Sequence, residues 1–321
     1  MLSGSELLCN ESGALAALDS PHAAVDLALL QDRRVLDKML QLQHTTLPTD
    51  NYLTEPNTDI KPSMRKIVTK WMLEVCDEYQ CEDQVFLVSV NLLDRFLNTT
   101  SVKRSQLQLS ACACLLLASK LRQCSYLSID LLVFCTDNCV TGDEIRQWEI
   151  LVVAKLRWDL CPVTPIDFVD VLLQQISIDA DTGSVRRHAA VLIAVAATER
   201  HFISQRPSYI AGAAIMAAMQ GLTHASLSNM APCIENISNM LDSSPDVIQT
   251  LLFALEESLK RASGSNSSSN GGLSPDTDDT GSSKQQSYSK MGGGSMMEDE
   301  EQMQEGDGKE TPVDVFDVNI S

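Results

Sequence analysis

The stretch SQLQLSACACLLLASKL at residues 105–121 decides the fold. Residues 105–119 carry no charge, and Leu, Ala and Cys occupy positions on nearly every side of a helix. A helix that is apolar all round is surrounded by other helices. A free cysteine in such a run behaves as a small buried hydrophobe. Residues 105–121 therefore predict a central helix that other helices enclose.

Amphipathic stretches lie on both sides of this central helix in the sequence. In residues 59–78, apolar side chains recur at the i, i+3, i+4, i+7 spacing of one helix face, and Pro62 falls near the first turn, where proline is tolerated. Thr141 and Glu144 have the spacing of a capping box, which begins another helix. We expect one five-helix unit, with helices at 59–78, 82–97, 105–121, 127–138 and 141–158.

A second unit follows a linker punctuated by prolines, Asp159-Leu-Cys-Pro-Val-Thr-Pro165. Its third helix is again apolar and is richer in small residues than the central helix of the first unit. The repeated order indicates a tandem duplication, with units at 59–160 and 161–262. The helices predicted in the second unit are 165–175, 184–202, 207–222, 229–241 and 244–261.

The two ends of the chain differ from these units. Residues 1–58 form an N-terminal segment, in which 25–43 predict one amphipathic helix and the polar residues 44–58 predict a loop. Residues 263–321 are rich in Ser and Gly and carry a net charge of −9, a composition that cannot bury enough apolar surface to fold. The predicted fold class is all-α: two tandem five-helix folds, preceded by an N-terminal helix and followed by a disordered acidic tail.

Composition excludes several classes of function. The chain has 24 Lys and Arg against 43 Asp and Glu, so its net charge of −19 argues against nucleic acid or an anionic membrane as a partner. The ten cysteines include no C-x-x-C pair, so we expect no metal and no cofactor. The five histidines are scattered, which gives catalysis little basis. No signal peptide is apparent, so reduced thiols in the cytosol or nucleus are expected.

Four motifs carry a family resemblance. They are MRKIVTKW at 64–71, NLLDRFL at 91–97, LLLASK at 115–120 and WEILVVAKLRW at 148–158, and together they resemble the cyclin box. LLCNE at 7–11 and ETPVD at 310–314 narrow the resemblance to the D-type cyclins. It implies two tandem cyclin folds and a regulatory subunit rather than an enzyme. Such a subunit binds and activates a G1 cyclin-dependent kinase and directs it to retinoblastoma-type proteins, promoting the G1/S transition in the nucleus and cytoplasm.

Two charged residues are candidates for the kinase contact. Lys120 ends the central helix and Glu149 lies on the predicted helix 141–158. By residue type alone they are solvated surface charges or an internal salt bridge, since charged groups are usually exposed. By resemblance they match the pair with which cyclins contact the kinase, and Leu121 and Ile150 beside them are apolar contacts.

A second set of residues matches the substrate-docking patch of cyclins. Spacing alone places the apolar members in the core, whereas the resemblance implies a shallow exposed patch for Arg-x-Leu-type segments of substrates and kinase inhibitor proteins. The set comprises Met64, Ile67, Trp71 and Leu107, with Glu74 and Gln108 as polar neighbours. Arg65 and Asp94 match an internal ion pair that ties the first helix of the box to the second.

Short motifs near the ends of the chain match docking and regulatory segments. Leu7, Cys9 and Glu11 form an L-x-C-x-E triplet, whose side chains point to one side of an extended chain. The triplet resembles the docking motif for the pocket of retinoblastoma-type proteins; otherwise it is a tail without a partner. Thr311-Pro312 suits a proline-directed kinase, and a ubiquitin ligase that reads the added phosphate would couple it to degradation.

Two other functions remain open at this point. Tandem cyclin folds also occur in transcription factors that clamp DNA and polymerase, but these carry a basic face and often a zinc ribbon. A cyclin-like adaptor that activates no kinase is the second alternative. Loss of kinase binding on changing Lys120 and Glu149 would separate a kinase regulator from both.

Overall fold

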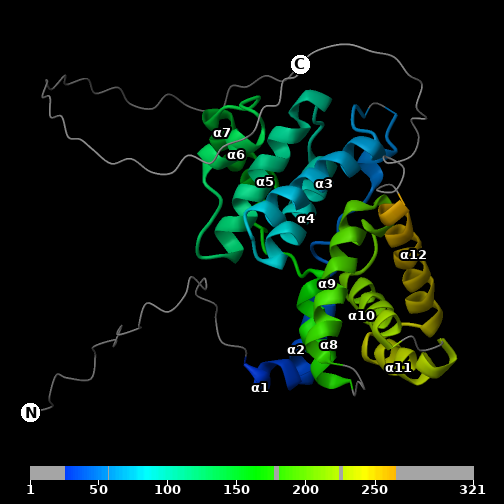
Figure 1. The fold of residues 1–321 in the computed structure, drawn as a ribbon. Coiled ribbons are helices and arrows are strands. Elements are labelled where there is room, and N and C mark those ends of the chain that lie inside the picture. Colours follow the sequence, from blue (N-terminus) through cyan, green and yellow to red (C-terminus); the bar gives the residue numbers. More distant parts are fainter. Residues whose placement is uncertain (1–25, 57, 177–180, 224–226, 265–321) are drawn as a thin grey trace, which may run out of the picture. The chain divides into compact units, whose positions relative to one another are not determined.

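The computed structural model describes residues 26–56, 58–176, 181–223 and 227–264, and every regular element in these ranges is a helix (Figure 1). The prediction of an all-α fold is confirmed. Contacts group the described residues into one compact unit. None of the helices in these ranges is long and apolar enough to cross a membrane. The candidate residues Leu7, Cys9, Glu11 and Thr311, and the predicted tail beyond Gly264, lie outside the described residues.

The first five-helix fold is built around α5 (Leu107–Arg122), which contacts the other four helices. Leu107 and residues 109–119 are buried, as a helix that is apolar on every side requires. The Thr141 hydroxyl and the Glu144 carboxylate cap the start of α7 reciprocally, in the predicted capping box. The surrounding helices are α3 (Pro62–Glu78), α4 (Asp83–Thr99), α6 (Ile129–Cys135) and α7 (Gly142–Lys155).

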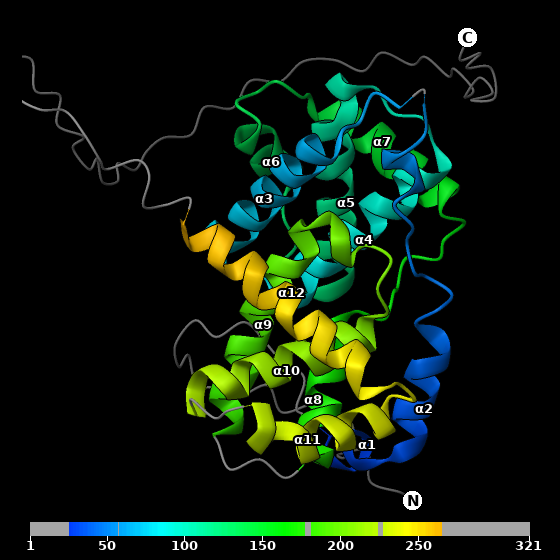
Figure 2. The same ribbon diagram turned by 90° about the vertical axis from the view of Figure 1, so that its right-hand side faces the viewer.

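The second five-helix fold is built in the same way around α10 (Pro207–Thr223). Its other helices are α8 (Pro165–Gln175), α9 (Thr182–Thr198), α11 (Leu227–Met240) and α12 (Pro245–Gly264). Gly212 lets α10 and α11 approach closely, because a Cβ atom at this position would lie 2.9 Å from Cγ2 of Ile237 on α11. Figure 2 shows α12 crossing α9 and α10, both of which it contacts. Helix α12 ends at Gly264, two residues beyond the predicted end of the second unit at 262.

The single helix predicted at 25–43 is wrong in detail, because the structure divides it into α1 (Leu27–Gln31) and α2 (Arg33–Leu42). The break falls at Asp32, whose carboxylate accepts a hydrogen bond from the backbone N–H of Arg34 and so caps α2. Both helices pack against α8. Helices α1 and α2 are thus attached to the second fold, and the Gln43 side chain that follows them accepts the backbone N–H of Ser208 at 3.1 Å.

Several other helix bounds differ from the sequence expectation. The helix expected at 127–138 ends at Cys135, and positive φ angles follow at Asp137 and Asn138. The helix expected at 141–158 ends at Lys155, before residues 157 and 158, which also have positive φ. The helix expected at 184–202 ends at Thr198, because Glu199 is extended, and a short 3₁₀ turn follows at Arg200–Phe202.

Candidate functional site

The expected kinase-contacting pair lies at one end of the central helix of the first fold. Lys120 stands in the last turn of α5, and its Nζ lies 2.6 Å from Oε1 of Glu149 on α7. The lysine side chain is 38% exposed and the glutamate side chain 19%. The Tyr126 ring lies 5.8 Å from the ammonium group, within the range of a cation–π contact. The internal salt bridge between Lys120 and Glu149, one of the two arrangements expected from residue type, is therefore present in the chain without a partner.

Apolar side chains stand beside this pair. Ile150 is 71% exposed and Leu121 is 42% exposed, although both are large aliphatic side chains. We call Lys120, Leu121, Glu149 and Ile150 the α5–α7 surface. Its apolar members offer area that a partner can cover.

The charges of the α5–α7 surface can act on the backbone of a partner. An ammonium group carries three donors, and a carboxylate accepts through two oxygens, so each retains capacity beyond the bond to the other. Exposed ion pairs contribute only about 0–1 kcal/mol, which makes this one easy to rearrange. Removing water from it would strengthen its hydrogen bonds to partner amides and carbonyls.

The six residues of the expected docking patch lie on α3 and α5, which pack against each other, but they are not equally accessible. Ile67 is 69% exposed, Glu74 is exposed, and Met64, Trp71 and Gln108 are partly buried. Leu107 is only 5% exposed and belongs to the core. The Trp71 indole N–H donates to the Cys135 carbonyl at 3.3 Å, which fixes the orientation of its ring.

Sequence reasoning missed Phe134 on α6, which is 70% exposed. It adjoins Cys135, the residue that accepts the bond from Trp71. Its apolar neighbours in Leu131-Leu-Val-Phe134 gave it the pattern of a core residue, so the sequence carried no signal of its exposure. We call Met64, Ile67, Trp71, Glu74, Gln108 and Phe134 the α3 patch.

Two residues inside the motif of the α3 patch face elsewhere. Val68 is buried in the core. Lys66 forms an ion pair with Glu199, which follows α9 in the second fold. Neither side chain is therefore part of the surface that the other residues of the motif expose.

Arg65 and Asp94 form a buried ion pair between α3 and α4, with each side chain 2% exposed. Arg65 Nε and Nη2 donate to the two oxygens of Asp94 at 2.7 and 2.8 Å. The Asp94 carboxylate also accepts the Tyr52 hydroxyl at 2.7 Å. Two oxygens thus receive three donors, which compensates the cost of burying the carboxylate.

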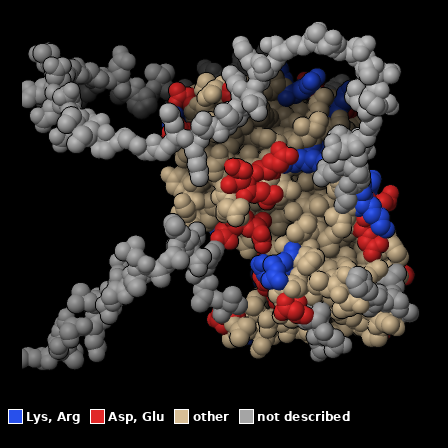
Figure 3. Space-filling view, viewed as in Figure 1, with Lys and Arg blue, Asp and Glu red and all other residues tan. Residues whose placement is uncertain are grey.

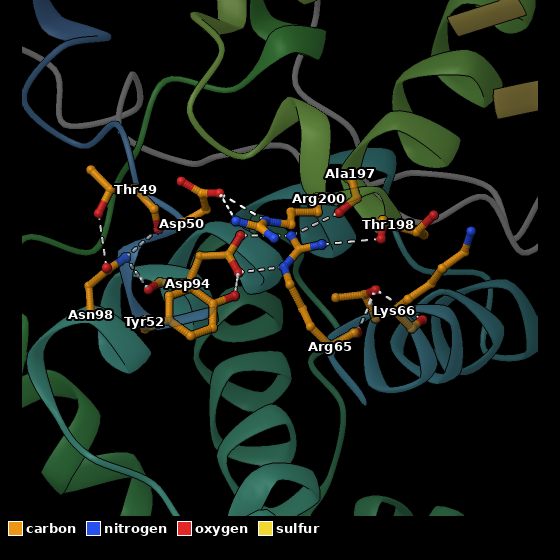
Figure 4. Close-up of polar contacts among 11 residues, drawn as sticks. Thr49, Asp50, Tyr52, Arg65, Lys66, Asp94, Asn98, Ala197, Thr198 and Arg200 are labelled. Carbon is orange, nitrogen blue, oxygen red and sulfur yellow. Dashed lines mark hydrogen bonds and ion pairs between the residues drawn. The ribbon is translucent and has the colours of Figure 1, made fainter. Parts of the chain in front are cut away.

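The same guanidinium reaches the second fold, which the sequence did not predict. Arg65 Nη1 donates to the Thr198 carbonyl at 3.2 Å and Nη2 to the Ala197 carbonyl at 3.0 Å (Figure 4). These carbonyls end α9, where the last turn has no partners within the helix and the helix dipole favours a cation. We call Arg65, Asp94, Tyr52 and these two carbonyl groups the Arg65 junction.

Ionisation of the Arg65 junction follows from burial and charge. Burial by itself lowers the pKa of the Arg65 guanidinium, but the charge and hydrogen bonds of Asp94 outweigh it and raise that pKa. Burial raises the pKa of the Tyr52 hydroxyl, and the charge of Asp94 raises it further. Arg65 is therefore charged and Tyr52 neutral at any physiological pH.

The rest of the described surface gives little support to metal or nucleic-acid chemistry. In the described ranges, no cluster of His, Cys, Asp and Glu could hold a metal ion. In Figure 3 the acidic side chains gather near the middle of the viewed face, whereas basic side chains lie in smaller separate groups. This face is therefore unlike the continuous basic surface that binds phosphates.

Comparison with known proteins places the two folds in one family. Residues 34–161 match the cyclin N-terminal domain, and residues 163–270 match the cyclin C-terminal domain. A viral cyclin structure from herpesvirus saimiri superposes with a TM-score of 0.63 at 23% identity, covering 71% of this chain and 98% of the viral one. The fold predicted from the cyclin-box motifs is confirmed.

Curated relatives narrow the family. The chain is 39% identical to human G1/S-specific cyclin-D3 over 267 residues, which cover 82% of this chain and 90% of the relative. It is 38% identical to mouse G1/S-specific cyclin-D1 over 265 residues, covering 80% and 88%. With both cyclin domains present and this identity over most of its length, the chain belongs to the D-type cyclins, a family of regulatory subunits of cyclin-dependent kinases rather than enzymes.

Proposed function

We propose that this protein binds and activates a G1 cyclin-dependent kinase through the α5–α7 surface. The observation that carries the proposal is Ile150, an isoleucine that is 71% exposed beside the Lys120–Glu149 pair. A large aliphatic side chain in water next to two charges with unused hydrogen-bonding capacity matches the apolar centre and polar rim of a protein interface.

Activation follows from differential binding. A protein kinase needs its own Lys–Glu ion pair and its activation loop in place before it transfers phosphate. The α5–α7 surface would contact the kinase only when its mobile helix is in that arrangement. A ligand that binds one state more tightly shifts the population toward that state. Binding of the cyclin therefore raises the fraction of kinase molecules in the active arrangement.

The test is affinity for a panel of cyclin-dependent kinases, measured with the double variant Lys120→Ala/Glu149→Ala. We expect affinity for the G1 kinases to fall about tenfold or more, with helicity unchanged by circular dichroism. The matched control is Arg186→Ala/Asp170→Ala, an ion pair of similar exposure on α8 and α9. Equal affinity of the Lys120/Glu149 variant and the wild type would refute the proposed surface and favour the adaptor or transcription function.

The Leu7, Cys9 and Glu11 triplet supports a retinoblastoma-type pocket protein as the substrate. With the kinase complex assembled, replacing all three by alanine should slow phosphorylation of a retinoblastoma-protein fragment. Phosphorylation of a short peptide that lacks the pocket is the control and should not change. An equal effect on both substrates would place the defect in the kinase complex instead of in docking.

The α3 patch supports recognition of Arg-x-Leu-type segments of substrates and kinase inhibitor proteins. Ile67 and Phe134 offer exposed apolar surface, and Glu74 offers an exposed carboxylate for the arginine. Ile67→Glu should weaken binding of an Arg-x-Leu peptide. It should leave kinase binding through the α5–α7 surface intact, and loss of both would indicate misfolding.

Thr311 supports the proposal that phosphorylation controls the degradation of this protein. Phosphate on Thr311 adds about −1.5 to −2 charges and three acceptor oxygens that an Arg-lined ubiquitin-ligase pocket can read. We propose that this modification drives nuclear export and degradation, so that the protein is found in nucleus and cytoplasm. Thr311→Ala should lengthen its half-life in cells and retain it in the nucleus. An unchanged half-life would show that degradation does not depend on Thr311.

A further inference from the structure

Two cysteines meet at the C-terminal end of α3. The backbone N–H of Cys81 donates to the Cys76 carbonyl at 2.9 Å, and that of Gln80 donates to the Asp77 carbonyl at 3.3 Å. Gln80 has φ of 50°, in the left-handed region. This pair of bonds around a left-handed residue is the Schellman motif that ends many helices.

The motif explains why the two thiols are neighbours. In a Schellman motif the side chains of the residues joined by the longer bond commonly contact each other, and here both are cysteines. Each thiol also shifts the pKa of the other, so the two sulfurs lie within range of interaction. The backbone therefore holds this dithiol together, whereas most of the other described cysteines occupy separate places in the fold.

The dithiol is accessible from one side. Cys76 and Cys81 line a groove of about 350 Å³ between α3, the start of α4 and α9. Cys81 is partly exposed, whereas Cys76 is only 5% exposed. A small reagent in the groove therefore reaches Cys81 more readily than Cys76.

The surroundings of Cys81 favour its thiolate. The hydrogen bond with Cys76 lowers the pKa of Cys81 and raises that of Cys76, and a hydrogen bond with Gln123 also lowers the pKa of Cys81. Burial opposes this, as do the charges of Asp77 and Glu82. Two cations, Arg186 and Arg187, line the same groove. Because the thiolate is the nucleophile, Cys81 is the attacking member of the pair.

We propose that Cys76 and Cys81 form a redox modification site at which a peroxide converts the dithiol to an intramolecular disulfide. The Cys81 thiolate attacks one oxygen of hydrogen peroxide, the O–O bond breaks, and the hydroxide that leaves takes up a proton to become water. The Cys76 sulfur then attacks the sulfur of the Cys81 sulfenic acid. The S–S bond forms, the S–O bond breaks, and the oxygen leaves as water with the Cys76 proton. Two thiols lose two electrons and two protons, and the peroxide is reduced.

A tryptic digest of the chain yields the peptide with Cys76 and Cys81 together with control peptides that carry other cysteines. Trypsin releases residues 71–95 with Cys76 and Cys81 as their only cysteines, and residues 105–120 with Cys112 and Cys114. Cys112 and Cys114 are fully buried, and residues two apart on a helix do not face each other. Burial raises the pKa of Cys112 to about 12 and also raises that of Cys114. The exposed Cys161 in residues 158–186 reports general oxidation.

The experiment treats the full chain with increasing hydrogen peroxide, alkylates the remaining thiols and identifies the peptides by mass without reduction. Peptide 71–95 should lose two hydrogen atoms and resist alkylation at doses that leave 105–120 fully alkylated, and dithiothreitol should reverse this. Full alkylation of 71–95 at doses that oxidise Cys161 would overturn the proposal. Simultaneous oxidation of 71–95 and 105–120 would do the same, since it would indicate an opened fold.

Two variants assign the roles of the sulfurs. With Cys76→Ser, the sulfenic acid of Cys81 has no thiol to attack it, so dimedone should label residues 71–95. With Cys81→Ser, the buried Cys76 should remain unlabelled. Labelling of the second variant as strong as that of the first would overturn the assignment of Cys81 as the attacking thiol. Circular dichroism establishes that both variants are folded.

Discussion

The two five-helix folds share one architecture but fill their centres differently. In the first fold, α5 is built from Leu, Cys and Ala and ends in the charged residues Lys120 and Arg122. In the second, α10 is built mainly from Ala, Ile and Gly, and the printed sequence of the helix contains no charged residue. The first fold keeps large side chains in its core and carries charged side chains at the end of its central helix. The second relies on close approach of its helices.

The exposed apolar residues follow the same division. Ile67, Phe134, Ile150 and Trp158 in the first fold are each more than two-thirds exposed, whereas Val191 and Phe253 in the second are 60% and 51% exposed. The comparison teaches that a duplicated fold can separate its tasks. The first copy exposes more apolar surface, and the second copy binds the first helix of the first copy through the Arg65 junction.

The largest expected effect on stability comes from a variant that removes the hydrogen bonds between the two folds. Arg65→Ala removes the cation from Asp94 and the donor from the end of α9, so a buried carboxylate loses its partner. We expect the free energy of unfolding to fall by about 3–5 kcal/mol, measured by urea denaturation. Arg146→Ala, which removes an exposed pair with Asp143, should change it by less than about 0.5 kcal/mol. Similar losses in the two variants would contradict a special role for the junction.

The next largest effect concerns kinase affinity, which should respond to a charge on the first fold and not to one on the second. Ile150→Asp places a charge in the centre of the α5–α7 surface and should weaken binding to a G1 cyclin-dependent kinase by about 2 kcal/mol, roughly thirtyfold. Phe253→Asp makes the same kind of change at a half-exposed site on α12. Its affinity for the kinase, measured by calorimetry, should equal that of the wild type. Weakening by both variants to a similar degree would place partner surfaces on both folds.

A smaller effect tests close approach in the second fold. Gly212→Ala adds a Cβ that would lie 2.9 Å from Ile237 Cγ2 and 3.1 Å from Leu241 Cδ1. We expect a loss of about 1–3 kcal/mol in the free energy of unfolding. In the same helix, Gly221→Ala meets nothing within 4 Å and should stabilise by up to about 1 kcal/mol. If Gly212→Ala also stabilises, the packing of α10 does not depend on a small residue there.

The smallest effect concerns the capping box that begins α7 in the first fold. Hydrogen bonds from the Thr141 backbone and hydroxyl lower the pKa of the Glu144 carboxyl. A carboxyl with a lowered folded-state pKa stabilises above its unfolded pKa, and that contribution is lost as the pH falls through the folded pKa. Glu144→Gln should therefore be less stable than the wild type at pH 7 and should lose that difference in acid. A difference between Glu144→Gln and the wild type that is the same at pH 7 and in acid would contradict this assignment.

Most of the fold could be predicted, because it depends on long periodic stretches. Apolar runs identified α5 and α10, and amphipathic spacing identified the helices around them. The break at Asp32 was missed because the amphipathic pattern continues across it, and only the capping bond to Arg34 divides the helix. The end of α9 was missed for a related reason. Its last carbonyls find their partner in Arg65, more than a hundred residues earlier in the chain.

The candidate site was predicted more by resemblance than by physics. Residue types alone left Lys120 and Glu149 as either solvated or paired, and the structure pairs them while keeping the lysine partly exposed. Helical spacing placed Ile67 in the core, yet it is 69% exposed, because α3 turns its Arg65 and Val68 side inward. Tyr52 had no sequence signal, because a loop of polar composition does not reveal which side chain folds under it.

Since one guanidinium hydrogen-bonds to both folds, neither fold can open alone without depriving a buried charge of acceptors. Opening of the second fold alone therefore costs these hydrogen bonds in addition to its own packing, and we expect slow amide exchange in the two folds to report coupled opening. A protease that cleaves transiently opened chains would then sample the whole molecule at once. We therefore expect substitutions that remove these hydrogen bonds at the end of α9 to lower the cellular abundance of the protein.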